Sequence, residues 1–198
     1  FRSIYRLIKM HYSILVTGIT GFIGLEVANH FLRKGYKVIA PIRRKVYPGK
    51  INTNLILCDY KDLFDIVKKN KVEFIYHFAS LTSVNHNDQN LIYKTNIYLA
   101  ELILKISDIC RPKMIVFSST ISIYGKILGP KLYFENNIKN SSVDSYGKSK
   151  LISEKILSDF CFKKKIKLVI FRLPGVIGYR SHSNLISKIL DILRSDNH

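Results

Sequence analysis

The chain has 198 residues, with 32 Lys and Arg against 14 Asp and Glu, and a formal net charge of +18. A hydrophobic content of 47% is enough to bury a core, which excludes general disorder, and the length fits one domain. The most apolar stretches, such as residues 97–109, contain charged residues and fall short of the ~20 apolar residues of a membrane-spanning helix. Lysines are spread along the whole chain without a nucleic-acid-binding motif, so we interpret the charge as a solvated basic surface that attracts anionic small molecules and predict no nucleic-acid partner.

Short β-rich runs alternate along the chain with longer segments of helical periodicity. Runs without polar alternation, such as Lys113–Phe117, are typical of strands that are covered on both faces. The alternation of strand and helix predicts right-handed crossovers and the α/β class, here a doubly wound parallel sheet (Rossmann fold) in one domain. The expected strands are residues 13–17, 36–42, 54–58, 72–78, 113–119 and 167–173, and the expected helices are 22–34, 62–70, 90–109, 145–163 and 185–194, with a polar loop over 126–143.

Residues 1–9 mix basic and apolar side chains but lack the continuous apolar run and cleavage site of a secretory signal. We expect them to form an N-terminal extension, and residues 10–198 to form the domain. The cysteines Cys58, Cys110 and Cys161 are isolated and odd in number, which favours reduced core residues of a cytoplasmic protein. The histidines are scattered as well, so the sequence predicts no metal site and no membrane partner.

A glycine-rich turn joins the first expected strand to the first expected helix, with the spacing G-x-x-G-x-x-G. Gly18 would allow the tight turn, Gly21 would let the backbone approach a pyrophosphate, and Gly24 would let the helix pack closely on the sheet. The free N–H groups at the start of that helix would face the anion. The motif therefore predicts a dinucleotide-binding site.

The end of the second expected strand carries no carboxylate. An NAD site usually places an Asp or Glu there to hold the ribose hydroxyls. Arg43 and Arg44 follow this strand instead, and guanidinium groups suit a 2′-phosphate because they offer a bidentate fork. We therefore predict NADP as the cofactor, with NAD as the alternative if these are ordinary surface arginines.

A tyrosine and a lysine lie four residues apart near the start of the helix expected at 145–163. Tyr146 and Lys150 therefore project from one helix face. A phenol with a pKa near 10 is a poor base at neutral pH, and a neighbouring ammonium group is expected to lower that pKa. The exit of the fifth expected strand supplies the hydroxyls of residues 118–120 at the edge where ligands bind in such sheets.

Together these motifs resemble those of the extended short-chain dehydrogenase/reductase family, particularly its NAD(P)-dependent nucleotide-sugar epimerase/dehydratase branch. The resemblance extends over residues 13–193. Thr17–Gly24 is similar to the family's T-G-x-x-G-F-I-G turn, Ser118–Gly125 to its S-S-x-x-V-Y-G segment, and Tyr146–Glu154 to Y-x-x-S-K-x-x-x-E. Further similar positions are Asp59 near the adenine, the His77–Ser80 segment that lines the cofactor, and Asn96 of the long helix.

By this resemblance Tyr146 exchanges a proton with a sugar hydroxyl or keto oxygen, Thr120 hydrogen-bonds the same oxygen, and Lys150 tunes Tyr146 and holds the ribose. These three are the implied catalytic residues, and Thr120 and Asn184 are the implied contacts to a nucleotide-sugar substrate. The resemblance also implies a homodimer through the two long helices. With the two arginines included, the expected cofactor-binding residues are Gly18, Thr20, Gly21, Phe22, Ile23, Gly24, Arg43, Arg44, Asp59, Tyr60, Phe78, Ala79, Ser80, Asn96, Ser118, Tyr146, Lys150 and Leu173.

Several features depart from the family pattern. Ile121 and Ser122 stand where dehydratases carry an Asp-Glu pair, which leaves epimerase or keto-reductase as the expected activity. Gly175 replaces a substrate-contacting Asn. Family members continue into a C-terminal substrate-binding part, so we expect that part to be truncated here and turnover to be weak or absent. The alternative is a catalytically silent NADP-binding module.

Overall fold

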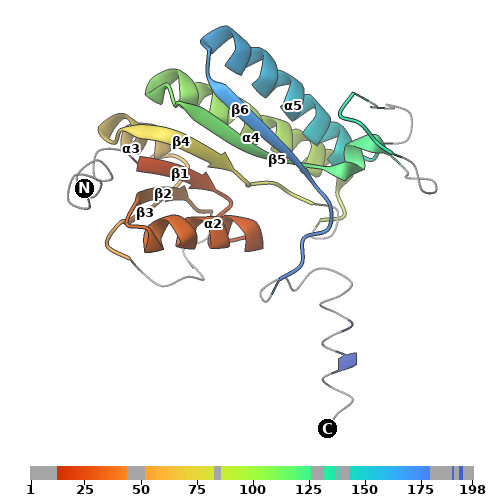
Figure 1. Ribbon diagram of the computed structural model, residues 1–198, viewed down its shortest axis with the longest axis horizontal. Coiled ribbons are helices and arrows are strands. Elements are labelled where there is room, and N and C mark those ends of the chain that lie inside the picture. Colours follow the sequence, from red (N-terminus) through yellow and green to blue (C-terminus); the bar gives the residue numbers. More distant parts are fainter. Residues whose placement is uncertain are drawn as a thin grey trace.

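Six parallel strands form one sheet in the order β3-β2-β1-β4-β5-β6 (Figure 1). The computed structural model describes residues 13–43, 52–82, 86–125, 132–136, 138, 143–178, 189, 192 and 193. The parallel α/β sheet predicted from the sequence is thereby confirmed. The strands are β1 (Ser13–Thr17), β2 (Lys37–Pro41), β3 (Leu55–Cys58), β4 (Val72–His77), β5 (Met114–Thr120) and β6 (Lys167–Leu173).

Helices cover the two faces of this sheet. They are α2 (Phe22–Arg33), α3 (Leu63–Lys69), α4 (Gln89–Cys110) and α5 (Ser145–Lys164), together with the 3-10 turn η1 (Ile121–Tyr124). α2 lies on one face, whereas α3, α4 and α5 lie on the other (Figure 1). The expected extension at 1–9 lies outside the described residues, as does most of the helix expected at 185–194.

Each face has its own apolar core. On the α2 side, Val16, Ala28 and Val38 belong to one cluster of buried residues. On the other side, Ile103 and Phe117 belong to a second and larger cluster with residues of α3, α4 and α5. Both faces of the central strands are therefore buried, as their continuous apolar runs predict.

The two long helices begin at capping aspartates. Asp88 accepts hydrogen bonds from the backbone N–H groups of Asn90 and Leu91 at 2.9 and 3.0 Å. Asp144 accepts one from Gly147 at 2.6 Å, which fixes the first turn of α5. Among the described residues, none of the helices combines the length and apolar content needed to cross a bilayer.

The strand order reverses at β1, which pairs with β2 on one side and β4 on the other. In open parallel sheets, ligands bind outside the carboxyl ends of the strands at such a switch point. The pairs Thr17–His77 and His77–Phe117 bring the exits of β1, β4 and β5 side by side. Three of the expected motifs follow these exits, so the topology gathers them at one edge of the sheet.

Candidate active site

The glycine turn between β1 and α2 is packed too tightly for side chains at two of its three glycines. Gly18 has a φ of +76°, and a Cβ there would lie 2.6 Å from the backbone nitrogen of Ala79. A Cβ on Gly24 would collide with the carbonyl oxygen of Gly18. At Gly21 the nearest atom would be that same oxygen at 3.3 Å, a tight contact but not a collision, so Gly21 is the least obstructed of the three glycines. Gly21 also lines a pocket.

That pocket has a volume of about 690 Å³. Its walls come from the glycine turn, the exits of β2, β3 and β4, and one face of α4. Many of the expected cofactor-binding residues line it, namely Gly18, Thr20, Gly21, Arg43, Tyr60, Phe78, Ala79 and Ser80. Phe22, Ile23, Gly24, Asp59, Asn96, Ser118, Tyr146, Lys150 and Leu173 are not among the lining residues. Arg44 and Asn184 lie outside the described residues.

The sequence analysis missed several lining residues, which are Pro41, Ile42, Leu81, His86, Thr95, Tyr98 and Leu99. Thr95 and Leu99 are four residues apart on α4 and therefore lie on one face of the helix. Leu99 is also three residues after Asn96, so the helical spacing from Asn96 could have identified this face. His86 follows no motif, and only the fold brings it to the pocket.

Tyr146 meets this pocket through Ser80. Ser80 lines the pocket, and its hydroxyl donates to the Leu81 carbonyl at 3.2 Å. Ser80 also lies close enough to the Tyr146 phenol to act on its pKa in the lowering direction. Gly147 follows Tyr146, and a Cβ there would lie 2.8 Å from the carbonyl oxygen of Ser122. The first turn of α5 therefore packs directly on η1, which follows Thr120.

The pKa values of the Tyr146–Lys150 pair differ from the expectation. Burial raises the pKa of Tyr146, and this effect together with the charge of Asp144 outweighs the lowering effect of Ser80. Burial lowers the pKa of Lys150 to about 7, against the opposing charge of Glu154. The expectation that Lys150 lowers the Tyr146 pKa is therefore wrong here, because burial disfavours both charged forms. At neutral pH the phenol stays protonated and can donate a proton.

Lys150 is held below the phenol. Its side chain is 2% exposed, and its Nζ donates to the carbonyl oxygen of Ser118 at 2.8 Å. The same nitrogen lies 4.8 Å from the centroid of the Phe117 ring and 5.9 Å from that of Tyr146. The ammonium group is thus fixed between the end of β5 and the first turns of α5.

Thr120 ends β5 and caps η1. Its Oγ1 accepts from the backbone N–H of Ser122 and contacts the Ser122 hydroxyl, both at 3.2 Å. Thr120 pairs with Leu173 in the register of β5 and β6. The expected catalytic hydroxyl therefore lies at the carboxyl edge of the sheet, next to the turn that packs on Gly147.

Asn96 and Ser118 make contacts within the protein. The Asn96 amide donates to the Leu81 carbonyl and the Ser149 hydroxyl, each at 3.0 Å, and its oxygen accepts from the Leu81 N–H at 2.8 Å. The Ser118 hydroxyl donates to the His77 carbonyl. The Asn96 amide thus makes these hydrogen bonds within the protein and holds the pocket wall at Leu81. A direct contact between Asn96 and the cofactor stays a prediction.

A buried imidazole joins the exits of β1 and β4. The Thr17 hydroxyl lies 2.7 Å from Nδ1 of His77 and accepts from the Ala79 N–H at 3.2 Å. Burial, reinforced by the charge of Lys150, lowers the pKa of His77 to about 3, so the ring is neutral. The neutral ring shares one hydrogen bond at Nδ1 with the Thr17 hydroxyl, whose oxygen also accepts from Ala79, and these bonds join the start of the glycine turn to the pocket wall.

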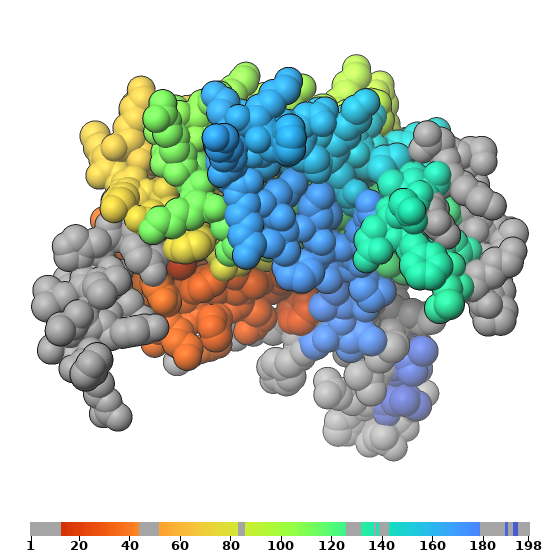
Figure 2. Space-filling model, turned by 45° about the horizontal axis from the view of Figure 1, so that its top comes forward, coloured from red at the N-terminus to blue at the C-terminus, as the bar shows by residue number. Residues whose placement is uncertain are grey.

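The segment after β6 returns to the glycine turn. A Cβ on Gly178 would overlap the ring of Phe22 in the first turn of α2. Figure 2 shows this blue segment descending from the sheet onto the orange surface around α2. The chain thus brings the exit of β6 back beside the first helix.

The sequence profile of the NAD dependent epimerase/dehydratase family matches residues 14–197. The chain belongs to this family. The resemblance deduced from the glycine turn, the strand exits and the Tyr-x-x-x-Lys motif is thereby confirmed at the level of the family.

Individual members of the family are similar over most of the chain. UDP-glucose 4-epimerase GEPI48 of Cyamopsis tetragonoloba is 28% identical over 185 residues, which cover 84% of this chain and 52% of that protein. The crystal structure of UDP-glucose 4-epimerase from Thermotoga maritima with UDP-glucose has a TM-score of 0.74 at 25% identity, covering 89% of this chain and 61% of that one. The UDP-glucose 4-epimerase of Thermus thermophilus in complex with NAD has a TM-score of 0.76 at 22% identity, covering 91% and 60%.

The chain thus spans about half the length of that curated relative and about three fifths of the two solved ones. The family is described as NAD dependent, and the Thermus thermophilus enzyme was solved in complex with NAD. The preference for NADP stays a prediction that rests on this chain's own arginines.

Proposed function

We propose that this chain carries the cofactor-binding part of an NAD(P)-dependent nucleotide-sugar epimerase or keto-reductase, with Tyr146 as its acid–base group. The observation that carries the proposal is the position of Ser80, which lines the pocket and lies close enough to the Tyr146 phenol to act on its pKa. A proton donor is thereby held at the wall of a pocket that the glycine turn opens.

The pocket fits a dinucleotide by its shape and its donors. Gly21 lines the pocket without a side chain, and this glycine is also the N-cap of α2 without a side-chain cap. The backbone N–H groups of that first turn are therefore available to a pyrophosphate, and the helix dipole favours its negative charge. A volume of about 690 Å³ lies within the range of sites for small ligands.

The chain's own residues would divide the work as follows. A bound nicotinamide supplies hydride transfer. Tyr146 donates its phenolic proton to the sugar oxygen during reduction and takes it back during oxidation. Thr120 orients that oxygen by a hydrogen bond. Lys150, with a pKa of about 7, gains or loses a proton near neutral pH and so supports either state of the phenol.

Two features limit the type of reaction and the substrate that we propose. Ile121 and Ser122 form η1 and supply no carboxylate, so elimination of water lacks the acidic pair that dehydratases use. Epimerisation and keto-reduction need only the phenol, the hydroxyl and the hydride. The relatives named above are UDP-glucose 4-epimerases, which favours a UDP-sugar as the substrate.

The cofactor would be NADP with NAD as the alternative. Arg43 lines the pocket just after β2, where no carboxylate is present. Its charge also lowers the pKa of Tyr60 against the larger effect of burial, which places the two side chains near one another. A 2′-phosphate at this point would meet the guanidinium group.

Substitution of one tyrosine tests the function. The protein is incubated with NADP or NAD and UDP-glucose, and UDP-galactose is followed by anion-exchange chromatography. Tyr146→Phe should lower the rate by about 10²-fold or more and leave the cofactor affinity, measured by nicotinamide fluorescence, unchanged. Tyr93→Phe on α4 is the matched control and should retain the rate. Since turnover by this chain is expected to be weak, the rates are compared at high protein concentration. If wild type and Tyr146→Phe both bind cofactor there and neither forms UDP-galactose, the chain is the silent binding module instead.

A further inference from the structure

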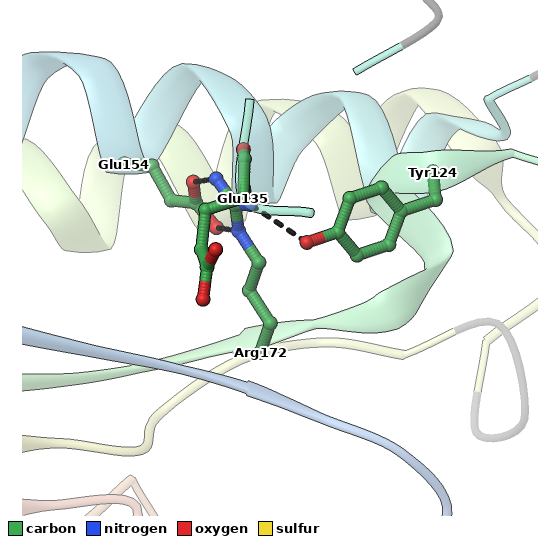
Figure 3. Close-up of polar contacts among 4 residues, drawn as sticks. All are labelled: Tyr124, Glu135, Glu154 and Arg172. Atoms are coloured by element: carbon green, nitrogen blue, oxygen red, sulfur yellow. Dashed lines mark hydrogen bonds and ion pairs between the residues drawn. The ribbon is translucent and has the colours of Figure 1, made fainter. Parts of the chain in front are cut away.

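Arg172 on β6 donates hydrogen bonds to three different parts of the chain. Its Nε and Nη2 donate to the two carboxylate oxygens of Glu154 at 3.1 and 2.8 Å. Its Nη1 donates to the Tyr124 hydroxyl at 2.9 Å and to the Glu135 carbonyl at 2.7 Å (Figure 3). The Glu154 side chain is 7% exposed and that of Arg172 is 17% exposed, so solvent screens this pair only in part.

These contacts join the elements that carry the proposed reacting groups. Glu154 lies four residues after Lys150 and eight after Tyr146, on the same face of α5. Tyr124 ends η1, whose first residue follows Thr120. The guanidinium group is thus the hydrogen-bonded connection between the Tyr146 helix and the turn beyond Thr120.

We propose that Arg172 is a positioning residue, which holds η1 and the 132–136 segment against α5 and thereby sets the placement of Thr120 relative to Tyr146. The kinetic part of this proposal rests on the proposed function, whereas its structural part does not. Only a guanidinium group can bind Glu154 and Tyr124 at once, because Nε and Nη2 bind the carboxylate while Nη1 donates to the hydroxyl. A lysine offers one ammonium group, which can satisfy Glu154 or Tyr124 but not both.

Hydrogen exchange at η1 tests the structural part. The amides of Ser122 and Gly125 close the turn by bonds to the Thr120 hydroxyl and the Ser122 carbonyl. Arg172→Lys and Tyr124→Phe should each speed exchange at these two amides about tenfold or more, because each removes a hydrogen bond between η1 and a charged group. Lys164→Met, which removes the ion pair of α5 with Asp108, is the control and should leave this exchange unchanged.

Kinetics test the positioning role. In Arg172→Lys and Tyr124→Phe, kcat should fall about tenfold while the cofactor affinity and the KM for the sugar nucleotide stay within about twofold. If Arg172 merely joined β6 to α5, Tyr124→Phe would change neither the exchange at η1 nor kcat, and the proposal would be overturned. Unchanged exchange in Arg172→Lys would overturn it as well. A wild-type protein without turnover would contradict the proposed function but would leave the exchange measurement decisive for Arg172.

Discussion

At the scale of single residues, Gly21 differs from the other glycines of its turn in what an added methyl group would meet. Gly21→Ala should perturb the fold less than Gly24→Ala, because a Cβ on Gly21 would make a tight contact of 3.3 Å with the Gly18 carbonyl oxygen, whereas a Cβ on Gly24 would collide with that atom. The same methyl group would enter the space proposed for the pyrophosphate. We expect Gly21→Ala to weaken cofactor binding about tenfold or more, since overpacking costs about 1–3 kcal/mol. Nicotinamide fluorescence measures the affinity and thermal unfolding measures the fold.

Gly175→Ala is the control for this experiment. A Cβ there would meet nothing within 4 Å, so neither affinity nor stability should change. If Gly21→Ala binds cofactor as well as wild type does, the pyrophosphate does not approach the turn at this glycine.

Lys150 gives a second prediction at this scale, which concerns pH. Burial lowers its pKa from 10.5 to about 7 in the folded protein. Between these two values the unfolded chain binds the extra proton, so this group's contribution to stability rises as the pH rises and is least favourable below pH 7. Lys150→Met removes the cost of burying the charge, and it should therefore raise the melting temperature more at pH 6 than at pH 9. A gain that is equal at both pH values would show that Lys150 is not desolvated.

The sequence predicted where the candidate residues lie better than it predicted their protonation. The shared helix face of Tyr146 and Lys150 follows from their spacing and the place of Thr120 from the end of a strand, whereas their catalytic roles stay predictions that rest on the resemblance. The rise of the Tyr146 pKa does not follow from spacing, because it depends on how deeply α5 packs against β5. Likewise, nothing in the spacing showed that both Asn96 amide hydrogens are used within the protein.

At the scale of elements, one carboxylate joins the starts of two adjacent strands. Glu73 on β4 is 7% exposed and pairs with Lys71 at 3.1 Å and with Lys113 at 2.6 Å. Burial acts to raise the pKa of Glu73, but the hydrogen bonds and charges of the two lysines together lower it. A lowered pKa in the folded state gives stability that is present above the unfolded pKa and is lost as the pH falls through the folded pKa.

Glu73→Gln should therefore destabilise the protein by about 1–3 kcal/mol at pH 7. The difference from wild type should shrink as the pH falls through the lowered pKa of Glu73, because the wild-type carboxylate then becomes protonated as well. Urea unfolding at several pH values measures this. Asp108→Asn breaks the pair with Lys164, in which both side chains are 52% exposed, and should change stability by less than about 1 kcal/mol. Equal effects of the two substitutions would contradict the role given to burial.

Most elements were predictable because their apolar patterns are long and continuous. β1 and β6 have the expected bounds, and the other strands and long helices differ by one or two residues at their ends. The turn η1 was not predicted, because it depends on the Thr120 side chain capping a polar segment. α5 also buries Ser149, Ser153 and Glu154, so its inner face could not be recognised from hydrophobicity alone.

At the scale of the whole molecule, the net charge of +18 produces a field that attracts any anionic cofactor. A preference for NADP over NAD requires more than this field, because both cofactors are anions. The preference must come from a positive group placed at the adenosine ribose. Of the two described lining residues that directly follow β2, Ile42 and Arg43, the arginine carries the positive charge. Removing a positive charge at the pocket and removing one far from it can therefore distinguish a local NADP site from the general attraction of anions.

Arg43→Gln and Lys163→Gln each remove one positive charge, the first at the pocket and the second in the last turn of α5. We expect wild type to bind NADPH more tightly than NADH, by a ratio that falls with salt as the extra phosphate is screened. Arg43→Gln should lower this ratio about tenfold at low salt, because a charged pair with phosphate contributes about 1.5–3 kcal/mol. Lys163→Gln should leave the ratio unchanged. Fluorescence titrations at two salt concentrations measure the affinities of all three proteins for both cofactors. If both variants lower the ratio equally, the field of the whole molecule, and not Arg43, distinguishes the two cofactors. A wild-type protein that binds NADH more tightly than NADPH would refute the assignment of NADP.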